Sequence, residues 1–118
     1  MIDLHSHILP GIDDGAETMD ESVAIVRELA SQGVTDIVAT PHFVDETIYM
    51  SSRRENLRLL DEVQQAANAE GIKVKLHIGN EIYICKKIDE LILFNRLSAL
   101  ADSRYLLVEL PMSGKFPK

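Results

Sequence analysis

Four short apolar runs along the chain are separated by longer segments with apolar positions at helical spacing. The third run alternates polar and apolar residues, so that Val74, Leu76 and Ile78 fall on one face of an extended strand. The fourth run is apolar except for Glu109, which is typical of a strand covered on both faces. Four strands are therefore predicted, over residues 2–5, 34–40, 73–78 and 105–110.

Both long intervening segments open with a capping box, in which side chains satisfy the first free N–H groups of a helix. These boxes are Thr18-Met-Asp-Glu21 and Ser52-Arg-Arg-Glu55. Each segment closes on a glycine, Gly33 or Gly71, the residue type that most often follows a helix end. A third, shorter helix is predicted over residues 87–93. The resulting order, β-α-β-α-β-α-β, favours an α/β fold with a parallel sheet and right-handed crossovers.

Residues able to bind metal ions follow the carboxyl ends of the predicted strands. Active sites form at that edge in α/β barrels and open parallel sheets. Within His5-Ser-His7, positions i and i+2 of an extended strand project from one face, so both imidazoles can reach one ion. A mixed imidazole and carboxylate set suits Mn²⁺, Fe or Zn²⁺ better than Ca²⁺ or Mg²⁺. The candidate ligands are His5, His7, Asp14, His42, Glu81 and Glu109.

Each candidate also has a purely structural interpretation. Two histidines separated by one residue occur often by chance, and the Asp13-Asp-Gly15 run is typical of a turn. His42 after Pro41 is compatible with simply capping a strand, and a lone Glu after a strand is usually a solvated loop residue. Glu109 differs, because an unpaired carboxylate buried among apolar residues is costly and needs a cation or a hydrogen-bonding partner. His77, inside the third strand, is interpreted as structural. The coincidence of six candidates at matching strand ends favours a metal centre.

Composition narrows the class of protein. The 118 residues fit one domain, with a net charge of −7 and no basic stripe of the kind that binds nucleic acid. No apolar run approaches the roughly 20 residues that a membrane span needs. Met1 leads directly into the first strand without a signal segment, and a cytoplasmic location is therefore expected.

Cys85 is the only cysteine, which excludes an intramolecular disulfide and a thiolate-rich metal site. One class of tyrosine phosphatases uses a cysteine nucleophile followed six positions later by an arginine. Here that position is Leu91, so Cys85 is not expected to act as a nucleophile.

The residues in and around these strand ends resemble a known family. Met1-Ile-Asp-Leu-His-Ser-His7, followed by Asp13-Asp-Gly15, is similar to the opening of the PHP (polymerase and histidinol phosphatase) superfamily. The chain resembles one branch more closely, the manganese-dependent protein-tyrosine phosphatases of bacterial capsule and exopolysaccharide gene clusters. The motifs that carry this closer resemblance are Thr40-Pro-His42, Gly79-Asn-Glu-Ile-Tyr83 and Asp102-Ser-Arg-Tyr105 with Glu109.

The resemblance implies a distorted (β/α)7 barrel of the TIM type, of which residues 1–118 form a single, truncated N-terminal half. It implies up to three divalent ions, Mn²⁺ first with Fe or Zn²⁺ as alternatives, held by the six candidate ligands together with further ligands from the second half of the family's chain. The implied reaction is hydrolysis of phosphotyrosine on a tyrosine autokinase that regulates polysaccharide synthesis, with a metal-bound hydroxide as nucleophile. The open flank of a half-barrel is expected to make the chain self-associate.

Two other functions are compatible with the same residues. One is a small-molecule phosphatase, such as an enzyme acting on histidinol phosphate with the same metals. The other is a catalytically incomplete module that binds metal or a partner protein, because the second half of the implied site is absent from these 118 residues.

Overall fold

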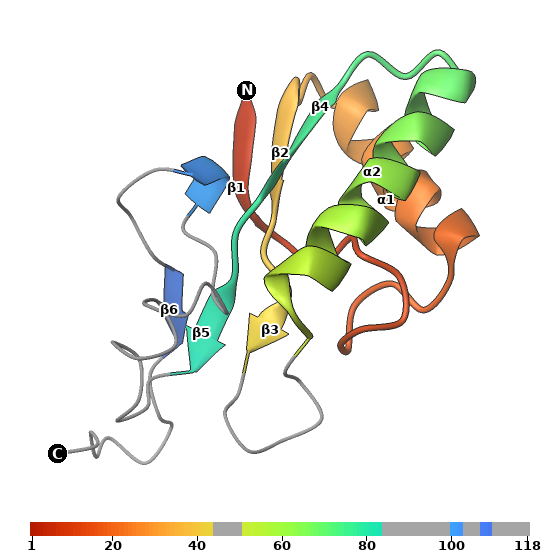
Figure 1. Ribbon diagram of the computed structural model, residues 1–118. Helices are drawn as coiled ribbons and strands as arrows, with labels where there is room; N and C mark the ends of the chain where they lie inside the picture. The colour runs from red at the N-terminus through yellow and green to blue at the C-terminus, as the bar shows by residue number, and fades with distance from the viewer. Residues whose placement is uncertain (44–50, 84–99, 103–106, 110–118) are drawn as a thin grey trace, which may run out of the picture.

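The computed structural model describes residues 1–43, 51–83, 100–102 and 107–109 as a set of parallel β-strands with two long α-helices (Figure 1). Its two sheets have the strand orders β1-β2-β4 and β3-β5-β6, and every strand pair is parallel. The predicted α/β class is therefore confirmed. In chain order the elements are β1 (Ile2–Ser6), α1 (Met19–Ser31), β2 (Asp36–Ala39), β3 (His42–Phe43), α2 (Arg53–Ala69), β4 (Lys75–Ile78), β5 (Glu81–Tyr83), the 3₁₀-helix η1 (Leu100–Asp102) and β6 (Leu107–Glu109).

Both predicted helix starts are confirmed by the side chains that cap them. The Thr18 hydroxyl accepts a hydrogen bond from the Glu21 N–H at 3.2 Å, and the Ser52 hydroxyl accepts one from the Glu55 N–H at 3.1 Å. The return bond of the first box differs from the usual pattern, because the Glu21 carboxylate accepts from the Glu17 N–H, one residue before the cap. Local chemistry at the helix ends therefore determines where α1 and α2 begin.

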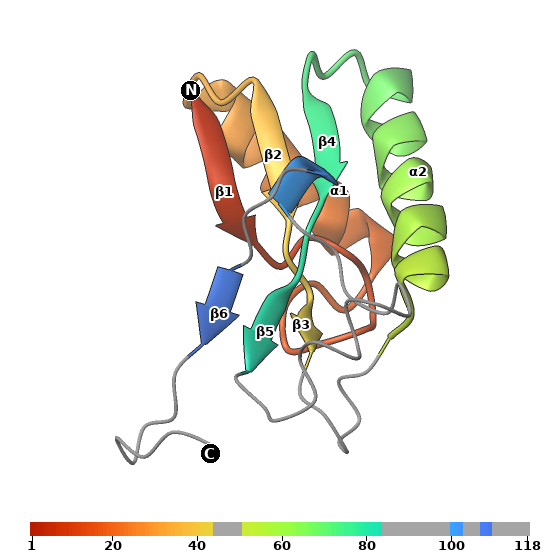
Figure 2. The same cartoon turned by 60° about the vertical axis from the view of Figure 1, so that its left-hand side comes forward.

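The core lies between the sheet β1-β2-β4 and the two helices, which both cover the same face of that sheet (Figures 1 and 2). Ile37 and Ala39 of β2 are fully buried there against Val26 of α1 and Val63 of α2. The alternation predicted for the third strand is confirmed, since Val74, Leu76 and Ile78 are all buried in this core. The packing fixes the sheet edge from which the candidate site residues project.

The second and third predicted strands each continue into a short extra strand that the sequence pattern does not predict. After β2 the chain passes through Thr40 and Pro41 into β3, and after β4 it passes through Gly79 and Asn80 into β5. Proline has no N–H to donate to a ladder, and two buried bonds bridge the interruption instead. The Glu81 N–H donates to the Pro41 carbonyl at 3.0 Å, and the Asn80 side-chain amide donates to the same carbonyl at 3.1 Å.

This interruption corrects the expectation of a single sheet with one strand per apolar run. Pairing moves from the first sheet to the second at the same level in both segments, from Ala39 opposite Ile78 to His42 opposite Glu81. The last predicted strand is confirmed over the described residues Leu107–Glu109. The predicted helix over residues 87–93 lies outside the described residues.

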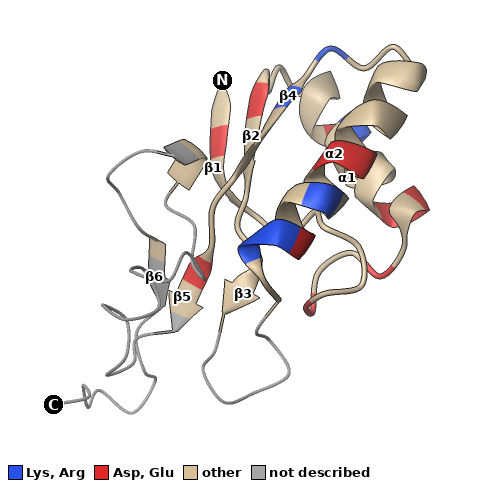
Figure 3. Cartoon of the chain, in the orientation of Figure 1, with Lys and Arg blue, Asp and Glu red and all other residues tan. Residues whose placement is uncertain are grey.

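Two ion pairs lie on the described helices, where Figure 3 colours the Lys and Arg positions blue and the Asp and Glu positions red. Arg27 of α1 binds the carboxylate of Glu70 through two contacts of 2.7 and 2.8 Å, and Arg58 pairs with Glu62 one turn later on α2. Among the described helices, none combines the length and the hydropathy required to cross a bilayer.

Candidate metal centre

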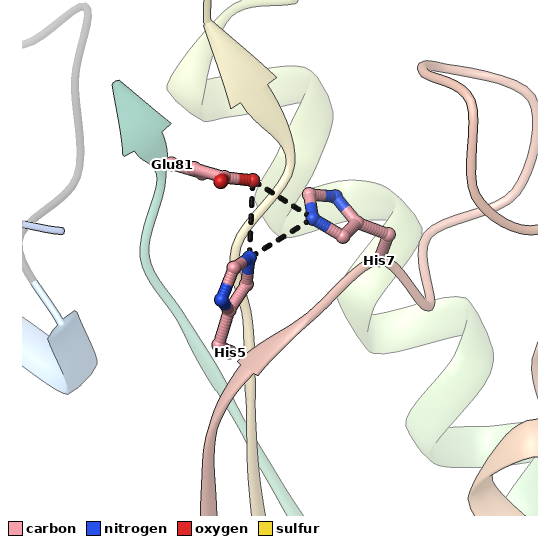
Figure 4. A group of neighbouring side chains, drawn as sticks. All are labelled: His5, His7 and Glu81. Carbon is pink, nitrogen blue, oxygen red and sulfur yellow. Dashed lines mark hydrogen bonds and ion pairs between the residues drawn. The ribbon is translucent and has the colours of Figure 1, made fainter. Parts of the chain in front are cut away.

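One group of candidate ligands forms where β1 ends beside the start of β5. His5 lies on β1, His7 follows it directly, and Glu81 is the first residue of β5 (Figure 4). The Glu81 Oε2 atom lies 3.0 Å from Nε2 of His5 and 2.9 Å from Nε2 of His7. The two Nε2 atoms are themselves 3.2 Å apart. Three potential donor atoms to one cation therefore face one another.

A second group shares His7 and extends toward the loop after β1. It consists of His7, Asp14 and His42, with ligand atoms that all lie within 4.8 Å of one another. The His42 Nε2 atom is 3.2 Å from Asp14 Oδ1, whereas its Nδ1 atom is 3.3 Å from Glu81 Oε2. The rings of His7 and His42 stack with centroids 4.3 Å apart. His42 therefore faces one group with each of its ring nitrogens.

The environment of Glu81 fits a bound cation. Its Oε2 atom is buried and accepts no hydrogen bond of acceptable geometry, although imidazole nitrogens of His5, His7 and His42 lie within 3.3 Å. An imidazole nitrogen that carries a lone pair repels a carboxylate oxygen at such a distance, so positive charge is needed between them. A ring proton can supply that charge at one nitrogen, whereas a divalent ion can satisfy all of these atoms together.

Asp13 is part of the site, although its sequence context predicts only a turn. Its side chain is 1% exposed. Its Oδ2 atom lies 2.9 Å from Nδ1 of His7 and accepts the backbone N–H of His42 at 3.0 Å, and its Oδ1 atom accepts the N–H of Gly15 at 2.9 Å. The sequence signal for this residue is the pair of adjacent aspartates, Asp13 and Asp14, but the sequence does not indicate which of the two faces His7.

Hydrogen bonding shifts the pKa values of the His7–Asp13 pair in opposite directions. The hydrogen bond to Asp13 raises the pKa of His7 above its usual 6.5, against the opposing effect of burial. Burial by itself raises the pKa of Asp13, but the bonds from His7, His42 and Gly15 outweigh it and lower that pKa below the usual 3.8. Asp13 is therefore an ionised acceptor near neutral pH.

The structure brings together five of the six predicted ligands, leaving Glu109 to be placed only by its backbone. Glu109 lies on β6 in register with Tyr83 of the neighbouring β5, and its side chain is outside the described residues. Cys85 also lies outside them. His77 lies on β4, apart from both groups, where its Nε2 atom is 3.0 Å from Asp36 Oδ1 on β2. This placement agrees with a structural role for His77.

Comparisons with known proteins identify relatives along the whole chain. A family model described as capsular polysaccharide synthesis, CpsB/CapC, matches residues 1–118. CapC of Staphylococcus aureus is 33% identical over 117 residues, which make up 99% of this chain and 45% of that protein. The tyrosine-protein phosphatase YwqE of Bacillus subtilis is 32% identical over 111 residues, 94% of this chain and 43% of YwqE.

Solved structures give the same relationship. A chain from the crystal structures of YwqE and of CpsB from Streptococcus pneumoniae, described as metal-dependent tyrosine phosphatases, superposes with a TM-score of 0.88. The sequences are 32% identical, and the match covers 94% of this chain and 44% of that one. The chain therefore spans less than half the length of the relatives it matches.

Proposed function

The chain belongs to the CpsB/CapC family of capsular polysaccharide synthesis, and we propose that it forms one half of a metal-dependent protein-tyrosine phosphatase. Support comes from relatives named tyrosine-protein phosphatases and from the described metal dependence of the structural neighbour. The observation that carries the proposal is Glu81 Oε2, a buried carboxylate oxygen without a hydrogen bond among three imidazoles.

In this proposal the metal ligands are the six candidates from the sequence, including Glu109 of β6. His5, His7 and Glu81 would hold one ion, and Asp14 and His42 would contribute to a second. Up to three ions are proposed for the complete site, with Mn²⁺ as the preferred metal and Fe or Zn²⁺ as alternatives.

The proposed reaction is hydrolysis of a phosphotyrosine ester. Bound divalent ions supply Lewis-acid chemistry, which neutralises phosphoryl oxygens and makes water more acidic. The residues of this chain hold the site in shape: the three histidines and Glu81 converge from two sheets, and the buried Asp13 orients His7. The exposed side of this cluster, where His5 has 50% of its side chain accessible, is where a phosphoryl group would enter.

We further propose that residues 1–118 are the N-terminal half of a distorted (β/α)7 barrel. The edge strand β1 exposes Ile2 and Leu4, at 61% and 56%, which is consistent with an apolar flank that another segment covers. For the chain by itself, association of two copies through this flank is expected. Light scattering after size-exclusion chromatography tests it, and a monodisperse monomer at high concentration contradicts it.

The proposed substrate is a phosphotyrosine protein, specifically a tyrosine autokinase that regulates capsule or exopolysaccharide synthesis, in the cytoplasm. A test compares release of phosphate from a phosphotyrosyl peptide and from histidinol phosphate. The chain is assayed alone and joined to the remaining length of a family relative, with and without a chelator. Hydrolysis of the peptide that disappears on chelation and returns with Mn²⁺ supports the proposal. Undiminished hydrolysis after chelation contradicts it, and a preference for histidinol phosphate favours the small-molecule phosphatase.

A non-catalytic metal-binding or partner-binding module is the second candidate. It requires only the two ligand groups of the described residues, without any catalysis. Metal bound tightly in the joined protein together with no hydrolysis of either substrate would select this function over the phosphatase.

A further inference from the structure

Asp13 connects three segments of the site through one buried carboxylate. Its oxygens accept from the His7 ring, from the backbone N–H of His42 on β3 and from the N–H of Gly15 in its own loop. His42 lies 29 positions away along the chain. With only 1% of its side chain exposed, Asp13 has little access to water that could replace these bonds.

The bond to His7 determines which ring nitrogen can bind a metal. An ionised carboxylate only accepts hydrogen bonds, so the proton of a neutral His7 ring must sit on Nδ1, facing Asp13. The lone pair is then on Nε2, which lies 2.9 Å from Glu81 Oε2 and 3.2 Å from Nε2 of His5. A metal-binding histidine commonly donates its other ring N–H to a carboxylate in this manner.

The two backbone bonds position the remaining ligands. The bond to the His42 N–H fixes the start of β3, where His42 is in register with Glu81. The bond to the Gly15 N–H closes the turn that carries Asp14. One carboxylate thus holds the backbone beside Asp14 and His42 while it holds the ring of His7.

We propose that Asp13 is the positioning residue of this metal centre, which fixes the ring tautomer of His7 and holds His42 and the Asp14 loop in their binding arrangement. The proposal rests on the metal site of the proposed function. Asp13 belongs to neither ligand group of the described residues, and each of its oxygens already accepts at least one N–H group of the chain.

The experiment uses nuclear magnetic resonance of the histidine rings and calorimetric titration with Mn²⁺. In the metal-free protein at alkaline pH, where the imidazoles are neutral, ¹H–¹⁵N spectra report which nitrogen of His7 carries the proton. We expect Nδ1–H in the wild type and a shift toward Nε2–H in Asp13→Ala, with Mn²⁺ affinity reduced about 10- to 100-fold. Asp13→Asn retains one acceptor oxygen and is expected to lie between the two.

Asp36→Ala is the matched control, because Asp36 bonds the ring of His77 outside the site at 3.0 Å, against 2.9 Å between Asp13 and His7. It should alter the spectrum of His77 and leave Mn²⁺ affinity unchanged. The proposal is overturned if Asp13→Ala keeps both the His7 tautomer and the wild-type affinity. Should Asp13→Ala fail to fold, an Asp13→Asn protein with wild-type Mn²⁺ affinity overturns it.

These outcomes are separate from the fate of the phosphatase function. A joined protein that binds Mn²⁺ without hydrolysing phosphotyrosine refutes the function, while the tautomer and affinity measurements still decide the role of Asp13. If the joined wild type hydrolyses phosphotyrosine while Asp13→Ala keeps the His7 tautomer and the Mn²⁺ affinity, the function stands and the proposed role of Asp13 is refuted.

Discussion

Replacement of Gly15 by alanine is expected to disturb the metal centre from within its loop. A Cβ atom at position 15 would lie 2.3 Å from the carbonyl oxygen and 2.4 Å from the Cβ of His7, where ordinary contacts are 3.4–4 Å. The backbone beside His7 must therefore move by about 1 Å, a strain that typically costs about 1–3 kcal/mol of stability. Since the imidazole moves with it, we expect Mn²⁺ affinity to fall about 10- to 100-fold.

Two measurements test this expectation, Mn²⁺ titration calorimetry and urea unfolding of the metal-free protein. Gly33→Ala is the control: its φ of +92° also disfavours alanine, but no atom lies within 4 Å of the new Cβ. The control should lose about 1–2 kcal/mol through its left-handed backbone and keep its metal affinity. Wild-type affinity and stability in Gly15→Ala would refute the close approach to His7 on which the reasoning depends.

Three further predictions concern charge, pH and packing. Glu81→Gln removes the negative charge that faces the imidazoles and should weaken Mn²⁺ binding, measured by calorimetry, by at least about 10- to 100-fold. The control Glu62→Gln, at an exposed position of α2, should leave Mn²⁺ affinity unchanged. In the metal-free protein, the raised pKa of His7 contributes stability that is lost as pH rises through it, and the lowered pKa of Asp13 contributes stability that is lost as pH falls through it. Urea unfolding should thus show the greatest difference between wild type and Asp13→Ala between pH 3.8 and 6.5, and a pH-independent difference would contradict the assignment. Val63→Ala, at a fully buried position of α2, should lower the free energy of unfolding by about 2 kcal/mol in the same assay, and a negligible loss would contradict the described packing.

The two helices could be predicted from the sequence because their signals are local. The cap at Thr18 lies within three residues of the N–H group it satisfies, and Gly33 follows the end of the same helix. The strands β3 and β5 are two and three residues long, too short for a periodic pattern. They exist because His42 pairs with Glu81 across a distance in sequence that no local rule describes.

The residue types of the site could be predicted from the sequence, but their contacts in space could not. Placing imidazoles and carboxylates at strand ends required only the order of the elements and the general geometry of parallel sheets. The role of Asp13 depends on the N–H of His42, which folding alone brings within reach. An aspartate before Asp14 and Gly15 resembles any turn aspartate until its three-dimensional neighbours are known.

The junction between the two sheets has a consequence for how the molecule opens. His5 belongs to β1 of the first sheet, while His42 and Glu81 begin strands of the second, so an ion bound by both sets cross-links the sheets. Removing the ion should loosen the second sheet before the helices, because a bound ion stabilises only the segments whose side chains bind it. Amide hydrogen exchange should then accelerate in β3 and β5 and remain slow in α1 and α2.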